Sequence, residues 1–392
     1  MKVWIENPFD NLPLEGFRPQ RYWLMASAFA AAGHDVTYWT SDFSHSLKAP
    51  RRLQGDFFGP PFAIRLVKTR PYASNVSIAR AMSHRRYASA WLEGAMAEAV
   101  KEGAPDIVIA SAPPLSAACA ALGLRKALGC RVVVDVMDAW PQTFRRLLPS
   151  ALKWAHPIAF APLARMARRA YRGADLVTGV CDGYGQLAHS AGAPSYYRAY
   201  HGIRLSAPAK QAPHDGLRLV YAGGMGRTYD LETVVRALAE IEGATLTIAG
   251  ADADAAAGLR GLASSLGCAD RLFTPGYLSS AELEGLLRSS DIGLVPMARD
   301  SFVGIPYKLA DYSAASLATA SSLSGESAEL LSRYRAGIVY APSDAAACAR
   351  AIREIADDLA GFKRRARAMA ESEFDAAKIY GDYVAVITRL RR

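Results

Sequence analysis

Lys308 and Asp311 are the charged residues whose spacing most directly suggests chemistry. They stand three positions apart in the segment GIPYKLADY at 304–312. On a helix this spacing places both side chains on one face, so the ammonium could hold a phosphate while the carboxylate accepts from a ribose diol. An ordinary surface ion pair is the other interpretation of the same spacing.

A glycine-rich turn in the sequence YAGGMGRTYDL at 221–231 is a second candidate for phosphate binding. It follows an apolar run and precedes a segment with helical periodicity. Glycines let an anion approach the backbone, and the start of a helix favours negative charge. The spacing matches neither the dinucleotide fingerprint nor the phosphate loop of nucleotide triphosphatases, so a simple tight turn is the alternative.

Strands and helices must position these candidate residues. Short apolar runs alternate with amphipathic segments along most of the chain. One such series spans 3–179 and another spans 217–295, separated by a polar stretch without periodicity at 201–216. The alternation is typical of parallel sheets with crossover helices, and the stretch between them is typical of a linker. The pattern predicts two doubly wound α/β domains. Ligands bind at the carboxyl ends of such strands, so we expect a site in a cleft between the domains.

The composition excludes several classes of protein. With 392 residues, 51% hydrophobic and 21% charged, the chain can bury sizeable cores and is neither disordered nor collagen-like. No apolar stretch approaches the ~20 residues that cross a bilayer. Five scattered cysteines indicate neither a disulfide framework nor a zinc site. We therefore expect a cytosolic protein whose cysteines are small core residues.

Positive charge is concentrated in the first half of the chain. Residues 1–200 hold 24 basic and 14 acidic side chains, whereas 201–392 hold 22 and 23. The basic segment 145–172 mixes Arg and Lys with Trp, Phe and Leu, which suits a helix lying on anionic lipid. A solvated basic helix is the alternative. Nucleic acid is disfavoured because no recognised binding motif accompanies the charge.

The order of the motifs resembles that of GT-B glycosyltransferases of family 4, especially bacterial members that add amino sugars in O-antigen, capsule or exopolysaccharide assembly. In the second half the likeness comprises the glycine-rich turn, Pro296, the segment 304–312, the stretch 321–330 and GIVYAP at 337–342. In the first half it comprises GHDVT at 33–37, SAPP at 111–114 and DVMDAWP at 135–141. The resemblance implies a GT-B fold, a nucleotide sugar bound by the C-terminal domain, an acceptor bound by the N-terminal domain, and retention of anomeric configuration.

The chain departs from the family pattern at the charged positions. The family's two glutamates, eight residues apart, align with Val303 and Asp311, so only a shortened ribose-binding carboxylate remains. The cations that usually follow the glycine turn are also replaced, which leaves Arg227 and Lys308 as the catalytic cations for the diphosphate. The donor-binding residues that the resemblance implies are Gly223, Gly224, Gly226, Tyr277, Gly304, Pro306, Asp311 and Tyr312.

On the acceptor side the family's histidine is absent, and Asp138 is the ionisable residue at that place. We name Asp138 as a candidate catalytic base or hydroxyl clamp, with a turn or cap carboxylate as the alternative. The loop after the first strand faces the expected cleft, although its residues could also begin an amphipathic helix. With the polar and basic segment 72–86, it supplies the acceptor candidates Gly16, Arg18, Arg21, Asn75 and Arg80.

No metal or cofactor is expected. Asp252 and Asp254 match the DxD pattern by which a different glycosyltransferase fold holds a divalent metal, but they open a helix and we interpret them as N-capping residues. The seven histidines never fall at metal-ligand spacing, and no serine-hydrolase motif occurs.

These observations predict a metal-independent GT-B hexosyltransferase with two Rossmann-like domains at 1–200 and 201–370 and a final helix at 371–392 that packs back on the first domain. The expected reaction transfers a sugar from a nucleotide diphosphate sugar, with a UDP-sugar preferred, to a lipid-linked saccharide. The expected place is the cytoplasmic face of the cell membrane, with peripheral contact through the basic first domain. A sugar-nucleotide 2-epimerase and a catalytically silent GT-B binding protein are the alternatives.

Overall fold

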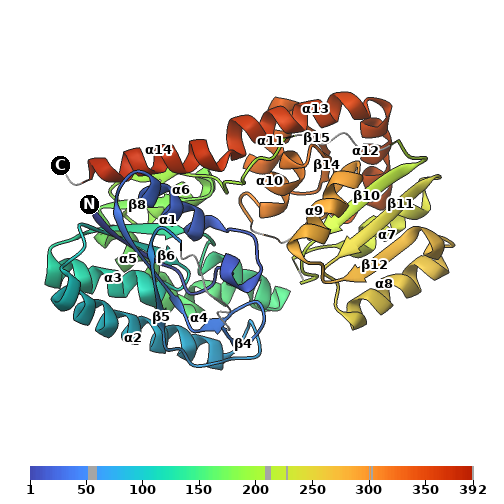
Figure 1. Ribbon diagram of the computed structural model, residues 1–392. Coiled ribbons are helices and arrows are strands. Elements are labelled where there is room, and N and C mark those ends of the chain that lie inside the picture. The colour runs from blue at the N-terminus through green and yellow to red at the C-terminus, as the bar shows by residue number, and fades with distance from the viewer. Residues whose placement is uncertain (52–59, 208–212, 227, 300, 302, 391–392) are drawn as a thin grey trace. The chain divides into compact units, whose positions relative to one another are not determined.

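The computed structural model describes residues 1–51, 60–207, 213–226, 228–299, 301 and 303–390. The chain forms two compact units (Figure 1). The first comprises Met1–Gly202 and Ala376–Arg392, and the second comprises Ile203–Asp375. The boundaries expected from the sequence, at residues 200 and 370, lie a few residues from these.

The first unit is built on a parallel sheet with the strand order β5-β2-β1-β6-β7-β8-β9. Its strands are β1 (Lys2–Glu6), β2 (Asp35–Ser41), β5 (Ala63–Val67), β6 (Ile107–Ala112), β7 (Arg131–Val136), β8 (Leu176–Gly179) and β9 (Tyr196–Arg198). A small antiparallel pair follows β2 and consists of β3 (Phe43–Ser44) and β4 (Ala49–Pro50).

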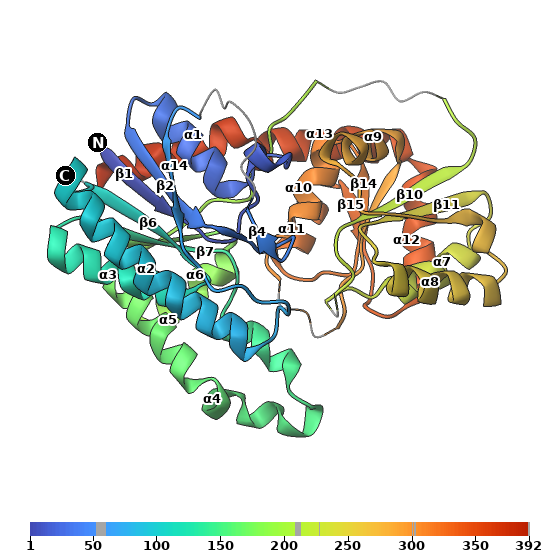
Figure 2. The ribbon, with the colours of Figure 1, turned by 60° about the horizontal axis from the view of Figure 1, so that its bottom comes forward.

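Helices cover both faces of this sheet. They are α1 (Arg21–Ala31), α2 (Ile78–Glu102), α3 (Leu115–Leu128), α4 (His156–Ala159), α5 (Ala161–Gly173), α6 (Asp182–Ser190) and α14 (Ala376–Arg389). Short 3-10 segments are η1 (Pro13–Glu15), η2 (Gln142–Leu147) and η3 (Ser150–Ala155). Figure 2 shows α2, α3 and α5 side by side on one side of the sheet and α1 with α14 on the other.

The side-chain alternation of β1 explains why both faces are covered. Val3 and Ile5 join the core that holds α1 and α14. Trp4 lies on the opposite face and makes an edge-on contact with Trp39 at 5.6 Å between ring centroids. Because β1 is buried on both faces, its sequence is a nearly continuous apolar run, as expected for a central parallel strand.

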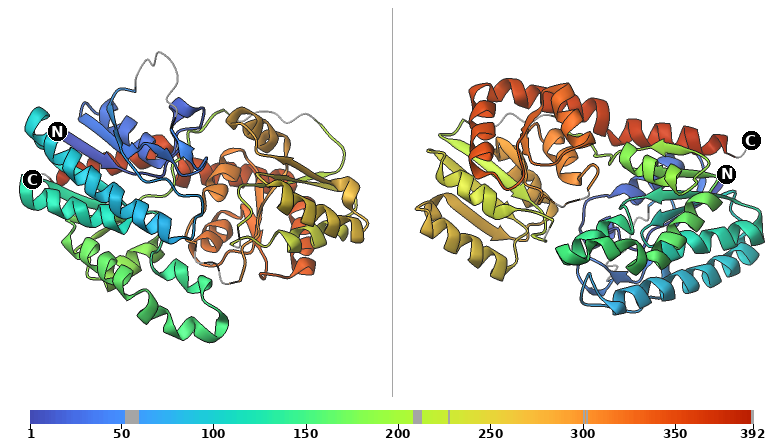
Figure 3. Two further views of the ribbon diagram at one scale, coloured as in Figure 1. Left: turned by 90° about the horizontal axis from the view of Figure 1, so that it is seen from below. Right: turned by 180° about the vertical axis from the view of Figure 1, so that it is seen from behind.

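Two helices of the first unit, α2 and α14, differ in how far the sequence indicated them. The 25-residue helix α2 was not predicted, because its first turns are polar and basic; Ser77 caps it by accepting from the Arg80 N–H at 3.1 Å. The last helix, α14, buries Tyr383 and Ile387 in the core of α1. As a result β1 begins and α14 ends at the same edge of this unit (Figure 3).

The second unit repeats this architecture with the strand order β12-β11-β10-β13-β14-β15. Its strands are β10 (Leu217–Ala222), β11 (Ala244–Ala249), β12 (Leu272–Gly276), β13 (Ile292–Val295), β14 (Ala318–Ser321) and β15 (Gly337–Val339). Its helices are α7 (Leu231–Ala239), α8 (Ala253–Ser265), α9 (Ser280–Ser289), α10 (Tyr307–Ala314), α11 (Glu326–Tyr334), α12 (Ala345–Asp357) and α13 (Leu359–Met369), with a 3-10 turn, η4 (Ala269–Arg271), and a π-helical segment, η5 (Ala370–Phe374).

Two hydrophobic cores flank the sheet of the second unit. Leu219 and Tyr221 of β10 belong to the core that contains α7, α8 and α12. Val220 of the same strand belongs to the core that contains Leu287 of α9 and Tyr312 of α10. Alternate residues of β10 thus anchor helices on both sides, and they fix where the loop after this strand leaves the sheet.

Candidate functional site

The loops after β10 and β13 meet at the point where the strand order of the second sheet reverses. These two strands are neighbours, although β11 and β12 separate them in the chain. Open parallel sheets bind ligands at such a switch point, because the loops on its two sides diverge. The loops are joined by hydrogen bonds of 2.9 Å from the Asp230 N–H to the Pro296 carbonyl and from the Ala298 N–H to the Thr228 carbonyl. They therefore form one framework.

Lys308 brings the glycine-rich turn and the 304–312 segment together. A Cβ placed on Gly223 would lie 2.4 Å from the Lys308 Nζ, and Gly223 has a φ of +138°. Glycine adopts this backbone conformation without strain, and its missing side chain leaves the space in which the ammonium lies. Nζ also lies 4.2 Å from the ring centroid of Tyr229 and 4.9 Å from that of Tyr221.

The surroundings of Lys308 suit an anionic ligand. In the described part of the chain its ammonium contacts these two rings and pairs with no carboxylate. Aromatic faces attract a cation without consuming its N–H donors. Lys308 is also the second residue of α10, which starts directly after Pro306. The ammonium and the first N–H groups of α10 therefore share one helix end, an arrangement that can hold a diphosphate.

Other predicted donor-side residues differ in exposure. Gly224 and Gly226 are exposed, and a Cβ on either would meet open space. Tyr277, immediately after β12, is 73% exposed. Arg227 lies outside the described residues. The turn thus presents backbone rather than side chains where Gly224 and Gly226 stand, as a phosphate-binding turn requires.

The segment around α10 is held from α11. The Ser327 hydroxyl donates to the Gly304 carbonyl at 2.8 Å. Pro306 occupies the N-cap position of α10, and Asp311, the fifth residue of this helix, is half-buried. Ser327 therefore fixes the loop that carries the predicted donor residues, a contact that no sequence motif indicated.

The structure corrects one donor-side prediction, Tyr312. Its side chain is fully buried, and its hydroxyl accepts from the Ala222 N–H at 3.0 Å. A Cβ on Gly293 would lie 2.2 Å from the Tyr312 ring. Tyr312 therefore joins α10 to β10 and β13 beneath the glycine-rich turn, where it supports the site but cannot touch a donor.

Arg21 is a second correction, because it lies in the interior of the first unit. Its Nε and Nη2 donate to the two oxygens of Asp135, both at 2.8 Å, and Nη1 donates to the carbonyls of Ala199 and Tyr200 at 2.8 and 3.0 Å. Both charged side chains are fully buried. Arg21 leaves no surface for an acceptor and instead ties α1 to β7 and to the end of the first unit.

Asp135 is stabilised in its charged form by this pairing. Burial would raise the pKa of Asp135, but Arg21, together with the Thr178 and Tyr22 hydroxyls, holds it below the usual value. Thr178 donates to Oδ1 at 2.6 Å and Tyr22 to Oδ2 at 2.8 Å. Each carboxylate oxygen therefore accepts two hydrogen bonds, as a buried charge requires.

Asp138 fits the turn-carboxylate alternative. Its Oδ2 accepts from the Trp140 Nε1 at 3.0 Å, and its Oδ1 accepts from the Thr143 hydroxyl at 2.8 Å. Burial raises the pKa of Asp138. With both oxygens engaged, the carboxylate positions the Trp140 ring, and this geometry describes it better than the predicted role of catalytic base.

Asn75 and Arg80 belong to a cluster of aromatic and basic side chains at the carboxyl end of the first sheet. The Arg80 guanidinium lies 5.4 Å from the Trp140 ring centroid and 5.6 Å from that of Phe9. Its Nε donates to the His84 Nε2 at 3.2 Å, and Nη1 donates to the Asn75 carbonyl at 2.7 Å. The two predicted acceptor residues are therefore in direct contact.

Lys48 and His45 complete this cluster, and neither carried a sequence signal. The Lys48 Nζ donates to the Asn75 Oδ1 at 2.5 Å and to the His45 carbonyl at 2.6 Å. Burial, reinforced by neighbouring cations, lowers the pKa of both His45 and His84 to about 3. Both imidazoles are therefore neutral at physiological pH. The cluster offers amide, imidazole and guanidinium groups beside aromatic rings, which suits a carbohydrate or phosphate ligand.

The other acceptor candidates lie in the loop before α1. Gly16 is exposed, has a φ of +82° and ends η1, and Arg18 is half-buried. The loop is tied down by Arg51, which pairs with Glu15 and donates to the Asp10 carbonyl at 2.7 Å. Gly16 and Arg18 thus lie in a loop of fixed conformation, whereas Arg21 is turned inward.

The basic segment 145–172 is a series of short helical pieces, η2, η3, α4 and α5, rather than one helix. Trp154 and Ile158 are each 72% exposed within it.

The interpretation of Asp252 as an N-capping residue is confirmed, because it is the N-cap of α8 and accepts from the Ala255 N–H at 2.8 Å. Across the described residues, no helix combines the length and apolar character that a membrane span requires.

Two family models match the chain, one in each unit. The Glycosyl transferase 4-like domain matches residues 20–199, and the Glycosyl transferases group 1 domain matches residues 216–358. Comparison with curated proteins finds no match.

Solved structures share the fold along the whole chain. Sucrose-phosphate synthase from Thermosynechococcus elongatus superposes with a TM-score of 0.78 at 16% identity, covering 99% of this chain and 98% of that one. Anabaena HepE in complex with UDP gives 0.69 at 12% identity, covering 99% of both chains. The lipopolysaccharide outer core galactosyltransferase WaaB gives 0.65 at 14% identity, covering 99% and 100%. With this fold and a matching family model in each unit, the chain belongs to the family-4-like glycosyltransferases of the GT-B fold.

Proposed function

We propose that this glycosyltransferase moves a hexose from a UDP-sugar to a lipid-linked saccharide in the assembly of a cell-surface polysaccharide, with retention of configuration and without a metal or other cofactor. The observation that carries the proposal is the placement of the Lys308 ammonium against Gly223 at the switch point of the second sheet. The HepE structures with UDP and with UDP-glucose support a uridine diphosphate donor.

The chemistry of the donor site follows from charge. Cleavage of the bond between the anomeric carbon and the diphosphate develops negative charge on the leaving group, and preorganised cations and N–H groups stabilise it. Lys308 and the first turn of α10 supply such groups, and Arg227 is assigned the same role from its place in the glycine-rich turn. Asp311 is the proposed acceptor of ribose hydroxyl hydrogens. Gly223 keeps the backbone open to the phosphates.

The acceptor side is assigned to the first unit. Its cluster of Asn75, Arg80 and Trp140 can bind a sugar ring by stacking and hydrogen bonding. Its net positive charge, with exposed Trp154 and Ile158 in the basic segment, suits contact with the anionic cytoplasmic face of a membrane. Arg18 lies in the loop before α1 and is proposed to meet the saccharide.

The test uses the full-length protein and a panel of nucleotide sugars. Thermal stabilisation reports donor binding, because a ligand that binds the folded state raises its melting temperature. Release of nucleoside diphosphate with membrane extract, measured with and without a chelator, reports transfer. Lys308→Ala should reduce turnover by about 10²–10³-fold, as loss of a group that stabilises developing charge does. Arg236→Ala, an exposed cation of α7, is the matched control and should keep wild-type turnover.

Three outcomes would contradict the proposal. If no nucleotide sugar stabilises the protein, the donor site is wrong and a silent binding protein becomes the better description. An isomerised donor without transfer would indicate an epimerase. Near-normal transfer by Lys308→Ala would remove the assigned role of this lysine.

A further inference from the structure

Lys48 and Arg80 bring two positive charges to one residue of the first unit, Asn75. The Lys48 ammonium donates to the Asn75 side-chain oxygen at 2.5 Å, and the Arg80 guanidinium donates to the Asn75 carbonyl at 2.7 Å. Lys48 lies between β3 and β4, whereas Arg80 lies in the first turn of α2. Two elements that are separate in the chain therefore direct their cations to the same place.

The other hydrogen-bond partners of these two cations carry no charge. Lys48 also donates to the His45 carbonyl at 2.6 Å. Arg80 also donates to the His84 Nε2 at 3.2 Å and interacts with the Tyr72 hydroxyl. In the part of the chain that the structure describes, every hydrogen-bond acceptor of Lys48 and Arg80 is a neutral group. Like charges gathered without a counter-charge favour an anionic ligand.

Asp138 is the carboxylate that acts on Arg80 through its charge, but it does not compensate the guanidinium. Its two oxygens accept from the Trp140 Nε1 at 3.0 Å and from the Thr143 hydroxyl at 2.8 Å. The pKa of Arg80 is lowered nevertheless, because burial outweighs this attraction. Burial, together with the charge of Arg80, also lowers the pKa of Lys48 to about 8. Both cations therefore lie where a bound anion would stabilise their charged form.

The backbone conformation at position 48 does not favour a lysine. The φ of Lys48 is +54°, in the left-handed region where glycine and asparagine are preferred. The turn is closed by the Lys48 N–H, which donates to the Ser44 carbonyl at 3.0 Å, a bond that does not depend on the side chain. What lysine contributes at this position is therefore its ammonium.

A cavity of about 510 Å³ opens beside the two cations. Asn75, Arg80 and Trp140 line it, together with apolar side chains. Its volume lies within the range of roughly 300–1,000 Å³ that is usual for small-molecule sites. The Arg80 guanidinium lies 5.4 Å from the Trp140 ring centroid, so a charged group and an aromatic ring border the same space. A sugar ring that bears an anionic group can contact both.

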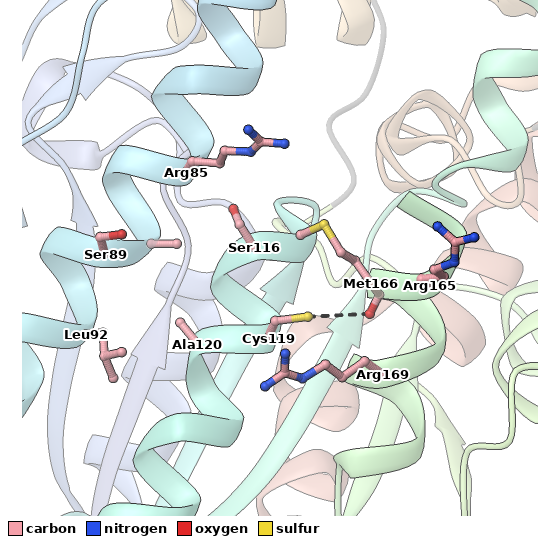
Figure 4. Close-up of a pocket in the computed structure, with 10 residues that line it drawn as sticks. Arg85, Ser89, Leu92, Ser116, Cys119, Ala120, Arg165, Met166 and Arg169 are labelled. Atoms are coloured by element: carbon pink, nitrogen blue, oxygen red, sulfur yellow. Dashed lines mark hydrogen bonds between the residues drawn. The ribbon is translucent and has the colours of Figure 1, made fainter. Parts of the chain in front are cut away.

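A second group of arginines borders a different cavity. Arg85 of α2 and Arg165 and Arg169 of α5 line a neighbouring cavity with Cys119 (Figure 4). Arg165 and Arg169 do not line the cavity beside Asn75. They therefore provide a reference for the effect of a cation that is near that cavity but outside it.

We propose that the acceptor saccharide carries a carboxylate, as a hexuronic acid does, and that Lys48 and Arg80 bind it. This inference rests on the proposed function and names the class of its acceptor: an acidic saccharide whose ring lies in the cavity beside Trp140. An ammonium has three N–H donors and a guanidinium has five, so both cations keep donors for a ligand. A planar carboxylate can accept two parallel hydrogen bonds from one edge of a guanidinium.

Neutral sugars and phosphates fit these groups less well. A neutral sugar leaves the two cations without a counter-charge. A phosphate presents three strong acceptor oxygens, whereas Lys48 already donates to Asn75 and His45. The donors that remain on Lys48 and Arg80 match the two oxygens of a carboxylate better than the three of a phosphate.

The test compares methyl glycosides of hexuronic acids with those of the matching hexoses, by ligand-observed NMR titration of the full-length protein. Glucose, galactose and mannose pairs are used, because other contacts set the preferred ring configuration. At least one uronide should bind about tenfold or more tightly than its own hexoside, as expected for hydrogen bonds to a charged group.

Variants of the two cations test their assignment. Lys48→Gln and Arg80→Gln should each reduce the preference for the uronide several-fold, whereas Arg80→Lys, which keeps the charge, should retain part of it. Lys126→Gln, at an exposed position of α3, and Arg169→Gln, beside the neighbouring cavity, are the matched controls and should keep the wild-type preference. Thermal melting without ligand verifies that each variant is folded.

Four results would overturn the inference. They are the absence of a uronide preference in all three pairs, a preference unchanged in both glutamine variants of the cluster, an equal loss in Arg169→Gln, and tighter binding of methyl glucoside 6-phosphate than of any uronide. Acetate is titrated as well, and binding as tight as that of the best uronide would show an anion site without recognition of a sugar.

Donor stabilisation and transfer are measured on the same samples. If a UDP-sugar binds and is used while uronides and hexosides bind alike, this inference fails and the proposed function stands. If a uronide binds through Lys48 and Arg80 but no nucleotide sugar binds, the proposed function fails and the acidic-saccharide site remains.

Discussion

The two units place different chemistry at the same topological position. In each sheet the strand order reverses beside the first strand, between β1 and β6 in the first unit and between β10 and β13 in the second. In the first unit this point holds Glu6, which is fully buried and accepts from the Ser111 N–H at 3.1 Å. In the second it holds Gly223 and the ammonium of Lys308. Topology sets where a crevice forms, and side chains decide which charge it accepts.

The two units also differ in the charge state of the side chains near these switch points. Burial raises the pKa of Glu6 to about 8, so this side chain is mostly a neutral acid at pH 7. In the same unit, Arg21 and Asp135 neutralise each other in the interior. The first unit thus satisfies its own charges near the switch point, whereas Lys308 keeps its donors available. The difference explains why a diphosphate is assigned to the second unit.

The largest effect is expected from breaking the buried pair of the first unit. Arg21→Ala leaves the Asp135 carboxylate buried without its partner, which should lower the free energy of unfolding by about 3–5 kcal/mol. Urea denaturation followed by fluorescence measures this loss. Arg168→Ala, an exposed position of α5, should change it by less than about 0.5 kcal/mol. A comparably small change at Arg21 would show that the pair does not hold this unit together.

Glu6→Gln sharpens the contrast through pH. The folded-state pKa of Glu6 is raised to about 8 from 4.5, so its contribution to stability is fully present below about pH 4.5 and is lost as pH rises through about 8. Glutamine cannot ionise. The free energy of unfolding of the variant should therefore rise by a few kcal/mol relative to that of the wild type between pH 5 and pH 9. Unfolding free energies at four pH values measure this, with Glu93→Gln as a surface control for a lost charge. If the difference in unfolding free energy between Glu6→Gln and the wild type does not change with pH, the pKa of Glu6 is not raised by burial.

A pair of glycine variants tests the second unit. Gly223→Ala combines a φ of +138° with a Cβ 2.4 Å from the Lys308 Nζ, whereas a Cβ on Gly224 meets open space. We expect Gly223→Ala to lower stability by about 1–3 kcal/mol and to weaken donor binding. Gly224→Ala should leave stability nearly unchanged. Thermal melting with and without UDP measures both effects, and equal stability of the two variants would show that a side chain at Gly223 causes no backbone strain.

The smallest effect on donor binding is expected from Tyr312→Phe. Removing the hydroxyl leaves the Ala222 N–H without its acceptor, which should cost about 1–3 kcal/mol of stability. Donor affinity, measured by UDP titration, should change less than tenfold, because the buried ring does not reach the ligand. A larger loss of affinity with unchanged stability would restore Tyr312 as a donor contact.

Sequence reasoning succeeded where local chemistry and periodicity agree. The strands β10 and β13 and the helix α3 lie within the two alternating series that the sequence predicts at 217–295 and 3–179. It failed where a residue's partner is distant in the chain. The sequence motifs assign Arg21 and Tyr312 to a ligand. In the structure, however, each side chain is hydrogen-bonded to a buried group of the protein itself. The helix α2 escaped notice because its polar first turns concealed its length.

The sequence by itself determined two parallel α/β units, a glycine turn at the end of a strand, and a cation at the start of a later helix, because each depends on residues within a few positions of one another. Only the tertiary structure decided that Lys308 rests on Gly223, that Arg80 lies against Trp140, and that Arg85 and Arg169 border one cavity. These contacts join residues on separate elements. Their distances depend on how strands and helices pack around a core, which no local pattern specifies.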